Sequence, residues 1–402
     1  MSNHYDVLIV GGGIVGSTLA CALGGSTIKV GVIEPQRALP ATGDYDLRVS
    51  AITLAAQTVF ENIGAWASMC AQRVSPVEAM TVWEDSAQLH FDSADIGEAC
   101  LAWIIENRVI VAALAERLHQ FTNVTLHTSA RVSTLHVEEG KVTVHLADGR
   151  TLNTSLLVGA DGAESCVRCE AGMAWTRHDL AQSAIVAMVH TEVPHAARAW
   201  QHFLTTGPLA FLPLAEPQSV SIVWSADSAR ANELMALEDE AFNAELQAAF
   251  GDHLGRVQLS SRRTCIPLAL GFARDYTAHR IALIGDAAHT VHPLAGQGAN
   301  LGILDAATLA ENLLARASAR RDLGAHSLLR RYERARKGAD LEMQAVTGGF
   351  RYLFGSDFPG AHALRAVGLR IVETMPVAKN YLMRRASGLA GELPQLAQRV
   401  LR

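Results

Sequence analysis

Three acidic residues stand where apolar, strand-like runs of this chain end. Glu34, Asp161 and Asp286 each close or directly follow such a run, and each adjoins a glycine or a turn. In an open parallel sheet, ligands bind at the carboxyl ends of the strands. A carboxylate at that edge can accept hydrogen bonds from sugar hydroxyls. One extended cofactor that lies across the strand ends explains the pattern better than three separate coincidences.

A glycine fingerprint lies near the start of the chain. Gly11, Gly13 and Gly16 follow the apolar residues 5–10 and precede a helical pattern over residues 17–23. In a dinucleotide-binding unit the first glycine makes a tight turn, the second admits the pyrophosphate, and the third allows close packing of helix on strand. The motif alone is weak, but its position between a strand and a helix makes this unit a strong prediction.

The second strand of this unit supports the same interpretation. Residues 28–34 are mostly apolar and end in Glu34, about 20 residues beyond the glycines. Its carboxylate is placed to bind the adenosine ribose hydroxyls and would repel a 2′-phosphate. We therefore expect the bound dinucleotide to be FAD or NAD rather than NADP.

A second glycine-rich loop follows Asp286. It leads into a helix predicted to continue to about residue 314, and Gly298, Ala299 and Asn300 stand at its start. Unpaired N–H groups and the positive end of a helix dipole favour negative charge. This arrangement suits a flavin, with its ribityl chain on Asp286 and its electron-rich ring edge at the helix start. The alternative is an ordinary strand–loop–helix crossover.

Two arginines could also reach the cofactor. Arg48 lies in a polar, turn-rich approach to a helix, and Arg108 lies in the first turn of a helix predicted over residues 103–119. A guanidinium can bind a pyrophosphate or a flavin, but a solvated arginine is an equally good interpretation of Arg48.

Composition limits the possible functions. The chain has 402 residues, 49% of them hydrophobic and 18% charged, so it can build a large core as one or two domains. A net charge of −6 argues against nucleic-acid binding. No signal peptide and no run long enough to span a bilayer are evident. Six cysteines do not form a disulfide framework, and the CxxC pair Cys166 and Cys169 lacks partners for a metal site. We expect a cytoplasmic protein.

The C-terminal tail is basic and amphipathic. Positive side chains alternate with apolar ones between residues 351 and 402. Such a segment can lie on an anionic membrane surface or pack against a partner. An ordinary docked helix is the simpler alternative, so contact with the periphery of the inner membrane stays open.

The motifs taken in order resemble the group A FAD-dependent aromatic hydroxylases. Three longer stretches are similar to the ubiquinone-biosynthesis hydroxylases in particular: residues 47–52, 159–163 and 285–298. Further similarity continues through residues 210–214, 221–225 and 330–334 to residues 349–350, so the resemblance covers essentially the whole chain. Its nearest branch is the 2-octaprenylphenol hydroxylase type, which hydroxylates the ring ortho to the phenolic oxygen.

The resemblance implies an α/β fold of the p-hydroxybenzoate hydroxylase type. A Rossmann-like FAD-binding domain would be interleaved with a mixed-β-sheet substrate domain and followed by C-terminal helices. The predicted limits are 1–75, 100–180 and 270–330 for the FAD-binding domain, 76–99 and 181–269 for the substrate domain, and 331–402 for the helical region.

The resemblance also implies a reaction. NADPH or NADH would bind transiently and reduce the bound FAD, which adds O₂ to form a C4a-hydroperoxide that transfers a hydroxyl to an electron-rich phenol. The substrate would be a prenylated phenol on the route to ubiquinone. A homo-oligomer and partners among the other ubiquinone-biosynthesis proteins are expected. The cofactor supplies the chemistry, and the protein positions the reactants and excludes water.

Some residues acquire a role only through the resemblance. Pro293 and Leu294 should lie near the reacting ring face. No nucleophile or metal is expected, and the catalytic residues, including any base, are left unassigned. His289 and His292 have metal-like spacing, but no carboxylate or third histidine in the sequence pattern completes a site. Glu164 departs from the family, which usually has asparagine there, and puts a negative charge near the presumed nicotinamide path.

Two other functions remain compatible with these motifs. An FAD oxidoreductase of another class, such as an oxidase or an isoprenoid reductase, shares the nucleotide fold and differs in its product. A non-catalytic scaffold within the ubiquinone-biosynthesis assembly would not oxidise NAD(P)H. The intact glycines and strand-end acids argue against the scaffold.

Overall fold

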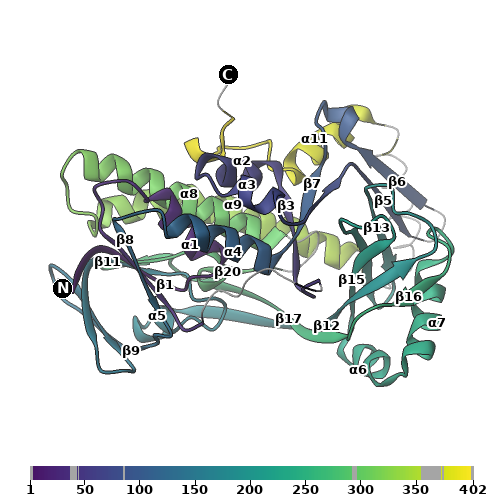
Figure 1. Ribbon diagram of the computed structural model, residues 1–402, viewed down its shortest axis with the longest axis horizontal. Coiled ribbons are helices and arrows are strands. Elements are labelled where there is room, and N and C mark those ends of the chain that lie inside the picture. Colours follow the sequence, from purple (N-terminus) through teal and green to yellow (C-terminus); the bar gives the residue numbers. More distant parts are fainter. Residues whose placement is uncertain are drawn as a thin grey trace.

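The computed structural model describes residues 3–36, 43, 45–84, 87–291, 297–354, 373 and 375–399. Two large sheets lie at opposite ends of the molecule, and two long strands run between them (Figure 1). Helices α8 and α9 lie along one side, and the C-terminal segment is close to α2.

The first sheet has eight strands, and five of them form a parallel core in the order β19-β11-β1-β2-β8. The bounds of these five are β19 (Ile281–Leu283), β11 (Thr151–Gly159), β1 (His4–Val10), β2 (Val30–Glu34) and β8 (Val124–Thr128). The antiparallel strands are β9 (Val132–Val137), β10 (Val142–Leu146) and β18 (Thr277–Ala278). All five parallel strands therefore end at the same edge, as the acid pattern predicts.

Helices cover this sheet because its central strands β1, β2, β11 and β19 are mostly buried and apolar on both faces. They are α1 (Ile14–Ala22), α4 (Asn107–Leu118), α8 (Gln297–Ser318) and α9 (His326–Phe354). Helices α1 and α8 pack closely at Gly302, where an added Cβ would lie 2.5 Å from a side-chain carbon of Val15. This glycine brings the start of α8 beside the glycine turn that precedes α1.

The second sheet has nine strands and is mixed, since β13 pairs with β5 in parallel while the other pairs are antiparallel. Its strands are β5 (Ala79–Glu84), β6 (Ala87–Asp92), β12 (Trp175–Thr191), β13 (Arg198–Leu204), β14 (Gly207–Pro213), β15 (Ser219–Asp227), β16 (Val257–Leu259), β17 (Thr264–Ala273) and β20 (His289–Thr290). Helices α6 (Ser228–Ala236) and α7 (Asp239–Phe250) bury an aromatic core against it. The part of the second sheet that these two helices do not cover faces the first sheet.

A small third sheet corrects one predicted helix start. Residues 102–106 form β7 (Ala102–Glu106), paired with β3 (Val49–Thr53) and β4 (Val74–Val77), and α4 begins only at Asn107. Ile104 and Ile105 are β-branched and buried between these strands, which favours the extended backbone. Arg108 still lies in the first turn of its helix.

The remaining elements are helices of at most 11 residues. They are α2 (Leu54–Asn62), α3 (Trp66–Cys70), η1 (Ser93–Ile96), α5 (Cys166–Glu170), η2 (Gly285–Ala287), α11 (Pro376–Ala386) and η4 (Gln395–Ala397). Among the described residues, no helix combines the length and apolar character needed to cross a bilayer.

The α/β fold with a mixed second sheet is as predicted. The domain limits stay a prediction, and β12 and β17 run across the limits set at residues 180 and 270.

Candidate active site

A cavity of about 850 Å³ lies between the carboxyl edge of the parallel strands and the second sheet. It is at the upper end of the range for small-molecule sites, roughly 300–1,000 Å³. Seven of the predicted cofactor residues line it: Gly13, Glu34, Arg48, Arg108, Asp286, Gly298 and Ala299. Residues from five separate segments thus meet at one site.

The three fingerprint glycines differ in what surrounds them. Gly11 has φ +103°, and an added Cβ would lie 2.3 Å from the carbonyl oxygen of Ala160; a Cβ on Gly16 would lie 1.9 Å from the carbonyl oxygen of Gly11. Both are therefore required for packing, and neither lines the cavity. A Cβ on Gly13 would meet nothing within 4 Å. Gly13 borders open space of the kind a pyrophosphate would fill.

Glu34 is held at the nucleotide end of the cavity. Its Oε2 accepts a hydrogen bond of 2.6 Å from the Gly12 amide, and its Oε1 accepts one of 2.9 Å from the Gln36 amide. Each oxygen keeps a further lone pair for a ribose hydroxyl. The glycine turn and the second strand are thereby joined at the place where the ribose is expected.

Asp286 is presented to the cavity by a sharp turn. Gly285 has φ +60°, which favours glycine, and the Asp286 side chain is exposed to the cavity while protein encloses it from other sides. This enclosure raises the pKa of Asp286, whereas the positive charges of His289 and Arg48 act in the opposite direction. The carboxylate faces the cavity, where it can accept hydrogen bonds from ligand hydroxyls.

Glu106, a buried glutamate that the sequence pattern did not single out, pairs with Arg108 and Arg73. Arg108 Nε and Nη2 each lie 2.9 Å from Oε2 of Glu106, and Arg73 Nε lies 2.9 Å from Oε1. Glu106 also accepts a 2.6 Å hydrogen bond from the amide of Asp46, two residues before Arg48. Its only signal in the sequence was an acid at the end of an apolar run, the signal that identified the other three acids.

Asp161 lies beside the cavity and does not line it. Its Oδ1 accepts a 2.5 Å hydrogen bond from the Ser165 hydroxyl, and its Oδ2 accepts from the amides of Cys166 and Val167. The carboxylate therefore binds the start of α5. Its spacing is that of a strand-end ligand, but its neighbours make it a helix-capping residue.

Asn300 is also directed away from the cavity. It is buried, and its side chain accepts from the Thr53 amide and donates to the Ala51 carbonyl, which ties α8 to β3. The cavity lining at the start of α8 consists of Gly298 and Ala299. The predicted substrate-side residues Pro293 and Leu294, and His292, lie outside the described residues.

The opposite wall of the cavity is apolar. Strands β12, β15 and β17 contribute it, through Ala184, Val186, Val223, Ile266, Leu268 and Leu270. At the rim, Glu164 lies 2.6 Å from Arg177 of β12, so its negative charge is paired. A ligand that spans the cavity would meet polar groups at one end and hydrocarbon at the other.

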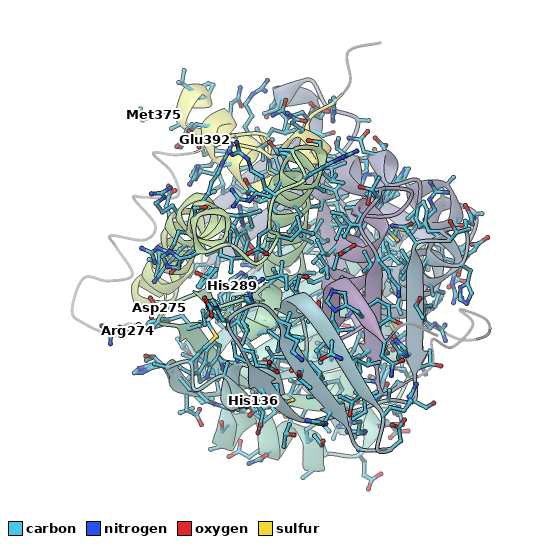
Figure 2. All side chains as sticks on the ribbon, turned by 90° about the vertical axis from the view of Figure 1, so that its left-hand side faces the viewer. His136, Arg274, Asp275, His289, Met375 and Glu392 are labelled. Carbon is cyan, nitrogen blue, oxygen red and sulfur yellow. The ribbon has the colours of Figure 1, made fainter. Side chains whose placement is uncertain are left out.

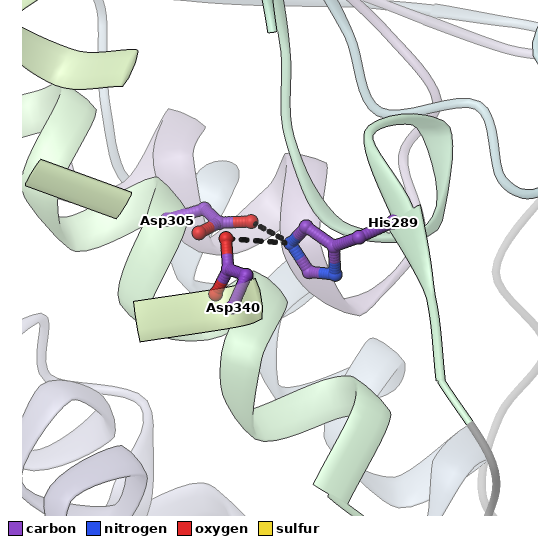
Figure 3. A group of neighbouring side chains, drawn as sticks. All are labelled: His289, Asp305 and Asp340. Carbon is purple, nitrogen blue, oxygen red and sulfur yellow. Dashed lines mark hydrogen bonds and ion pairs between the residues drawn. The ribbon is translucent and has the colours of Figure 1, made fainter. Parts of the chain in front are cut away.

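His289 is buried within the protein (Figure 2), and its charge acts on the Asp286 carboxylate. The expectation that no carboxylate accompanies it was wrong, because Asp305 of α8 and Asp340 of α9 converge on its Nε2 at 2.6 and 3.4 Å (Figure 3). The sequence could not reveal this, since the acids come from two helices 16 and 51 residues away. Arg336 pairs with both acids, so the group already holds two cationic side chains.

Comparison with known proteins agrees with this geometry. The family described as the FAD binding domain matches residues 4–346. The ubiquinone hydroxylase UbiL of Rhodospirillum rubrum is 40% identical over 98% of this chain and 93% of its own length. The 3-demethoxyubiquinol 3-hydroxylase of Escherichia coli K12 is 33% identical over 96% of this chain and 98% of its own. The chain belongs to the family of FAD-dependent ubiquinone-biosynthesis hydroxylases.

The solved structure of PqsL, described as a probable FAD-dependent monooxygenase from Pseudomonas aeruginosa, has the same fold as this hydroxylase. It superposes with a TM-score of 0.78 over 92% of this chain and 100% of that one, at 25% identity. FAD is therefore the cofactor of the hydroxylase, and the site accommodates it. Gly13 leaves room for the pyrophosphate, and Glu34 and Asp286 offer acceptors for sugar and ribityl hydroxyls.

Proposed function

We propose that this protein hydroxylates the aromatic ring of a prenylated phenol on the route to ubiquinone, using O₂ and electrons from NADPH or NADH. The observation that carries the proposal is the continuity of the cavity, which joins the cofactor residues at one end to the apolar wall of β12, β15 and β17 at the other. The ring position ortho to the phenolic oxygen, expected from the resemblance to the 2-octaprenylphenol hydroxylases, stays a prediction.

The residues at the polar end bind and orient the cofactor. FAD, once reduced, activates O₂ and supplies the oxygen atom that enters the ring. Glu34 would accept the ribose hydroxyls, Asp286 the ribityl hydroxyls, and the amides of Gly298 and Ala299 would face the electron-rich edge of the ring system. Arg48 adds a positive charge near Asp286. No side chain is assigned as a base.

The residues at the apolar end exclude water. Wall residues such as Val186, Val223 and Leu268 offer no hydrogen bonds to water, so a greasy ligand would displace solvent from the cavity. Water exclusion matters because, in a solvated site, the activated oxygen is lost as H₂O₂. Pro293 and Leu294 remain the proposed contacts of the reacting ring.

A membrane-bound substrate would favour a contact between the protein and the bilayer. Helix α11 exposes Val377 and Tyr381, and Met375, the residue before the helix, is also exposed. Figure 2 shows Met375 at the periphery of the molecule. We include peripheral attachment to the inner membrane, a homo-oligomer and ubiquinone-biosynthesis protein partners in the proposal. The apolar helix face supports the first of these.

The test combines a spectrum with a product assay. The purified protein should be yellow, and its oxidation of NADPH or NADH should rise on addition of a short-chain prenylphenol. Mass spectrometry under ¹⁸O₂ should find one labelled oxygen atom in a catechol product.

Other outcomes would contradict the proposal. Oxidation that is indifferent to the phenol and yields only H₂O₂ would indicate an oxidase, and a reduced alkene would indicate an isoprenoid reductase. A protein that reconstitutes with FAD but transfers no electrons from either nucleotide would favour the scaffold, or another electron donor if photoreduced flavin still yields the catechol.

A further inference from the structure

The turn that presents Asp286 is closed by a single carboxylate oxygen. Oδ2 of Asp305 accepts a 3.0 Å hydrogen bond from the Gly285 amide and lies 2.6 Å from Nε2 of His289. Asp286 stands between these two contacts in the sequence. A shift of Asp305 would therefore move both ends of the turn, and the Asp286 carboxylate with them.

Helix α9 holds Asp305 from the other side. Arg336 donates a 2.6 Å hydrogen bond from Nε to Oδ1 of Asp305, and a 2.9 Å bond from Nη2 to Oδ1 of Asp340. Arg336, Asp340 and Asp305 are at least 96% buried. A buried ion pair fixes geometry because breaking it leaves an uncompensated charge. The four residues His289, Asp305, Arg336 and Asp340 are called the buried charge cluster below.

A metal ion is a poor occupant of this cluster. His289, Asp305 and Asp340 bring their ligand atoms within 4.8 Å of one another, as a metal site would. Arg336, however, donates to both carboxylates, and its guanidinium cannot lose its proton. A bound cation would have to displace this side chain from a fully buried position.

The charges of the cluster balance when His289 is protonated. The groups that face His289 are Asp305 of α8, Arg336 and Asp340 of α9, Asp286 of η2, and the ring of Tyr276 at 5.7 Å. Burial alone would lower the pKa of His289, but Asp340 and Asp305 outweigh it and raise the pKa to about 9. Loss of that proton would leave two carboxylates and one arginine behind Asp286.

We propose that the buried charge cluster is a positioning device for the cofactor: it fixes the Gly285–His289 turn and keeps an imidazolium behind Asp286. The inference rests on the proposed role of Asp286 in holding FAD. While His289 is protonated, the turn is closed and the Asp286 carboxylate lies in a positive field. After deprotonation, Asp305 and Asp340 repel each other and Asp286, so the hold on FAD weakens.

The experiment measures the dissociation constant of FAD from the holoenzyme between pH 6 and 10, by the fluorescence of released FAD. In the wild type, the affinity for FAD should fall as the pH rises into the alkaline range; this part of the curve is called the alkaline limb. Asp340→Asn keeps the shape of the side chain but removes one charge that stabilises the imidazolium. The midpoint of the limb should move down by about one pH unit, with affinity near pH 6 little changed, since each unit is roughly a tenfold change in the protonation equilibrium. The matched control is Asp322→Asn, which breaks the ion pair with Arg280 in the same half of the molecule.

The outcomes separate this inference from the proposed function. An unmoved midpoint in Asp340→Asn, or the same shift in Asp322→Asn, would overturn the positioning role. If Asp340→Asn does not fold, His289→Gln replaces it, and an alkaline limb that persists there would also overturn the role. Asp286→Ala should weaken FAD binding at every pH. Full retention of FAD in Asp286→Ala would instead refute the assignment of Asp286, whatever the other variants do.

Discussion

At the scale of single residues, the same residue type does different work at Gly13 and Gly16. A methyl group on Gly13 would project into open space beside the cavity, whereas one on Gly16 would lie 1.9 Å from a backbone oxygen. The fingerprint thus contains one position that serves the ligand and others that serve packing. This division of roles is the one that the fingerprint predicts.

Substitution by alanine should separate the two roles. Gly13→Ala, at the N-cap of α1, should cost the FAD-free protein less than about 1 kcal/mol of folding stability. It should nevertheless weaken FAD binding by roughly tenfold or more, since about 1.4 kcal/mol of steric conflict suffices. Urea unfolding and FAD titration measure the two quantities.

Gly16→Ala is the matched control for this prediction. It should lower stability or prevent folding, because the backbone of the glycine turn must shift to admit the Cβ. Gly13→Ala with undiminished FAD affinity would show that the pyrophosphate lies elsewhere.

At the scale of elements, the sequence predicted most of what local patterns control. The βαβ unit and α8 are both visible in apolar periodicity and glycine spacing. The β7–α4 boundary was missed because an apolar run of this length fits a strand or a helix equally well. The strand-end position of Asp161 predicts a cofactor ligand, yet its carboxylate accepts hydrogen bonds from the nearby amides of α5. Asn300 is predicted at the start of α8, and its side chain donates to β3. Contacts such as His289 with Asp340 depend on the packing of helices remote in sequence.

Helix α11 carries a prediction of its own. Val377 is 85% exposed and Tyr381 is 58% exposed, one helical turn apart. Burying such a side chain in a bilayer surface gains roughly 1.5–3 kcal/mol. Val377→Glu with Tyr381→Glu should therefore reduce sedimentation with phosphatidylcholine vesicles containing 30% phosphatidylglycerol by at least about tenfold.

The control for the membrane contact is Val193→Glu. Val193 is also exposed, at 46%, but it lies on the loop after β12 in the second sheet. This variant should bind vesicles as the wild type does. Equal binding by the α11 double variant would exclude this helix as the attachment site.

At the scale of the whole molecule, one buried imidazolium should control stability across a defined pH window. The pKa of His289 is raised from 6.5 to about 9. A folded-state pKa above the unfolded one means that stabilisation is complete below pH 6.5 and is lost as the pH rises through 9. The thiols of buried Cys21 and half-buried Cys166 have pKa values raised to about 12 and 11, so they affect stability only above this window. The lowered pKa of His127 acts only below it.

The free energy of unfolding should therefore fall by roughly 3 kcal/mol between pH 6.5 and 9. Urea denaturation at the two pH values, with FAD removed so that cofactor release does not contribute, measures the change. His289→Gln is neutral at both values and can still donate a hydrogen bond to Asp305, so its stability should stay nearly constant across the window. A wild-type stability that does not change, or a His289→Gln variant that loses as much, would mean that the buried charge cluster holds a neutral histidine. The turn before α8 would then be fixed by hydrogen bonds alone, without a positive charge behind Asp286.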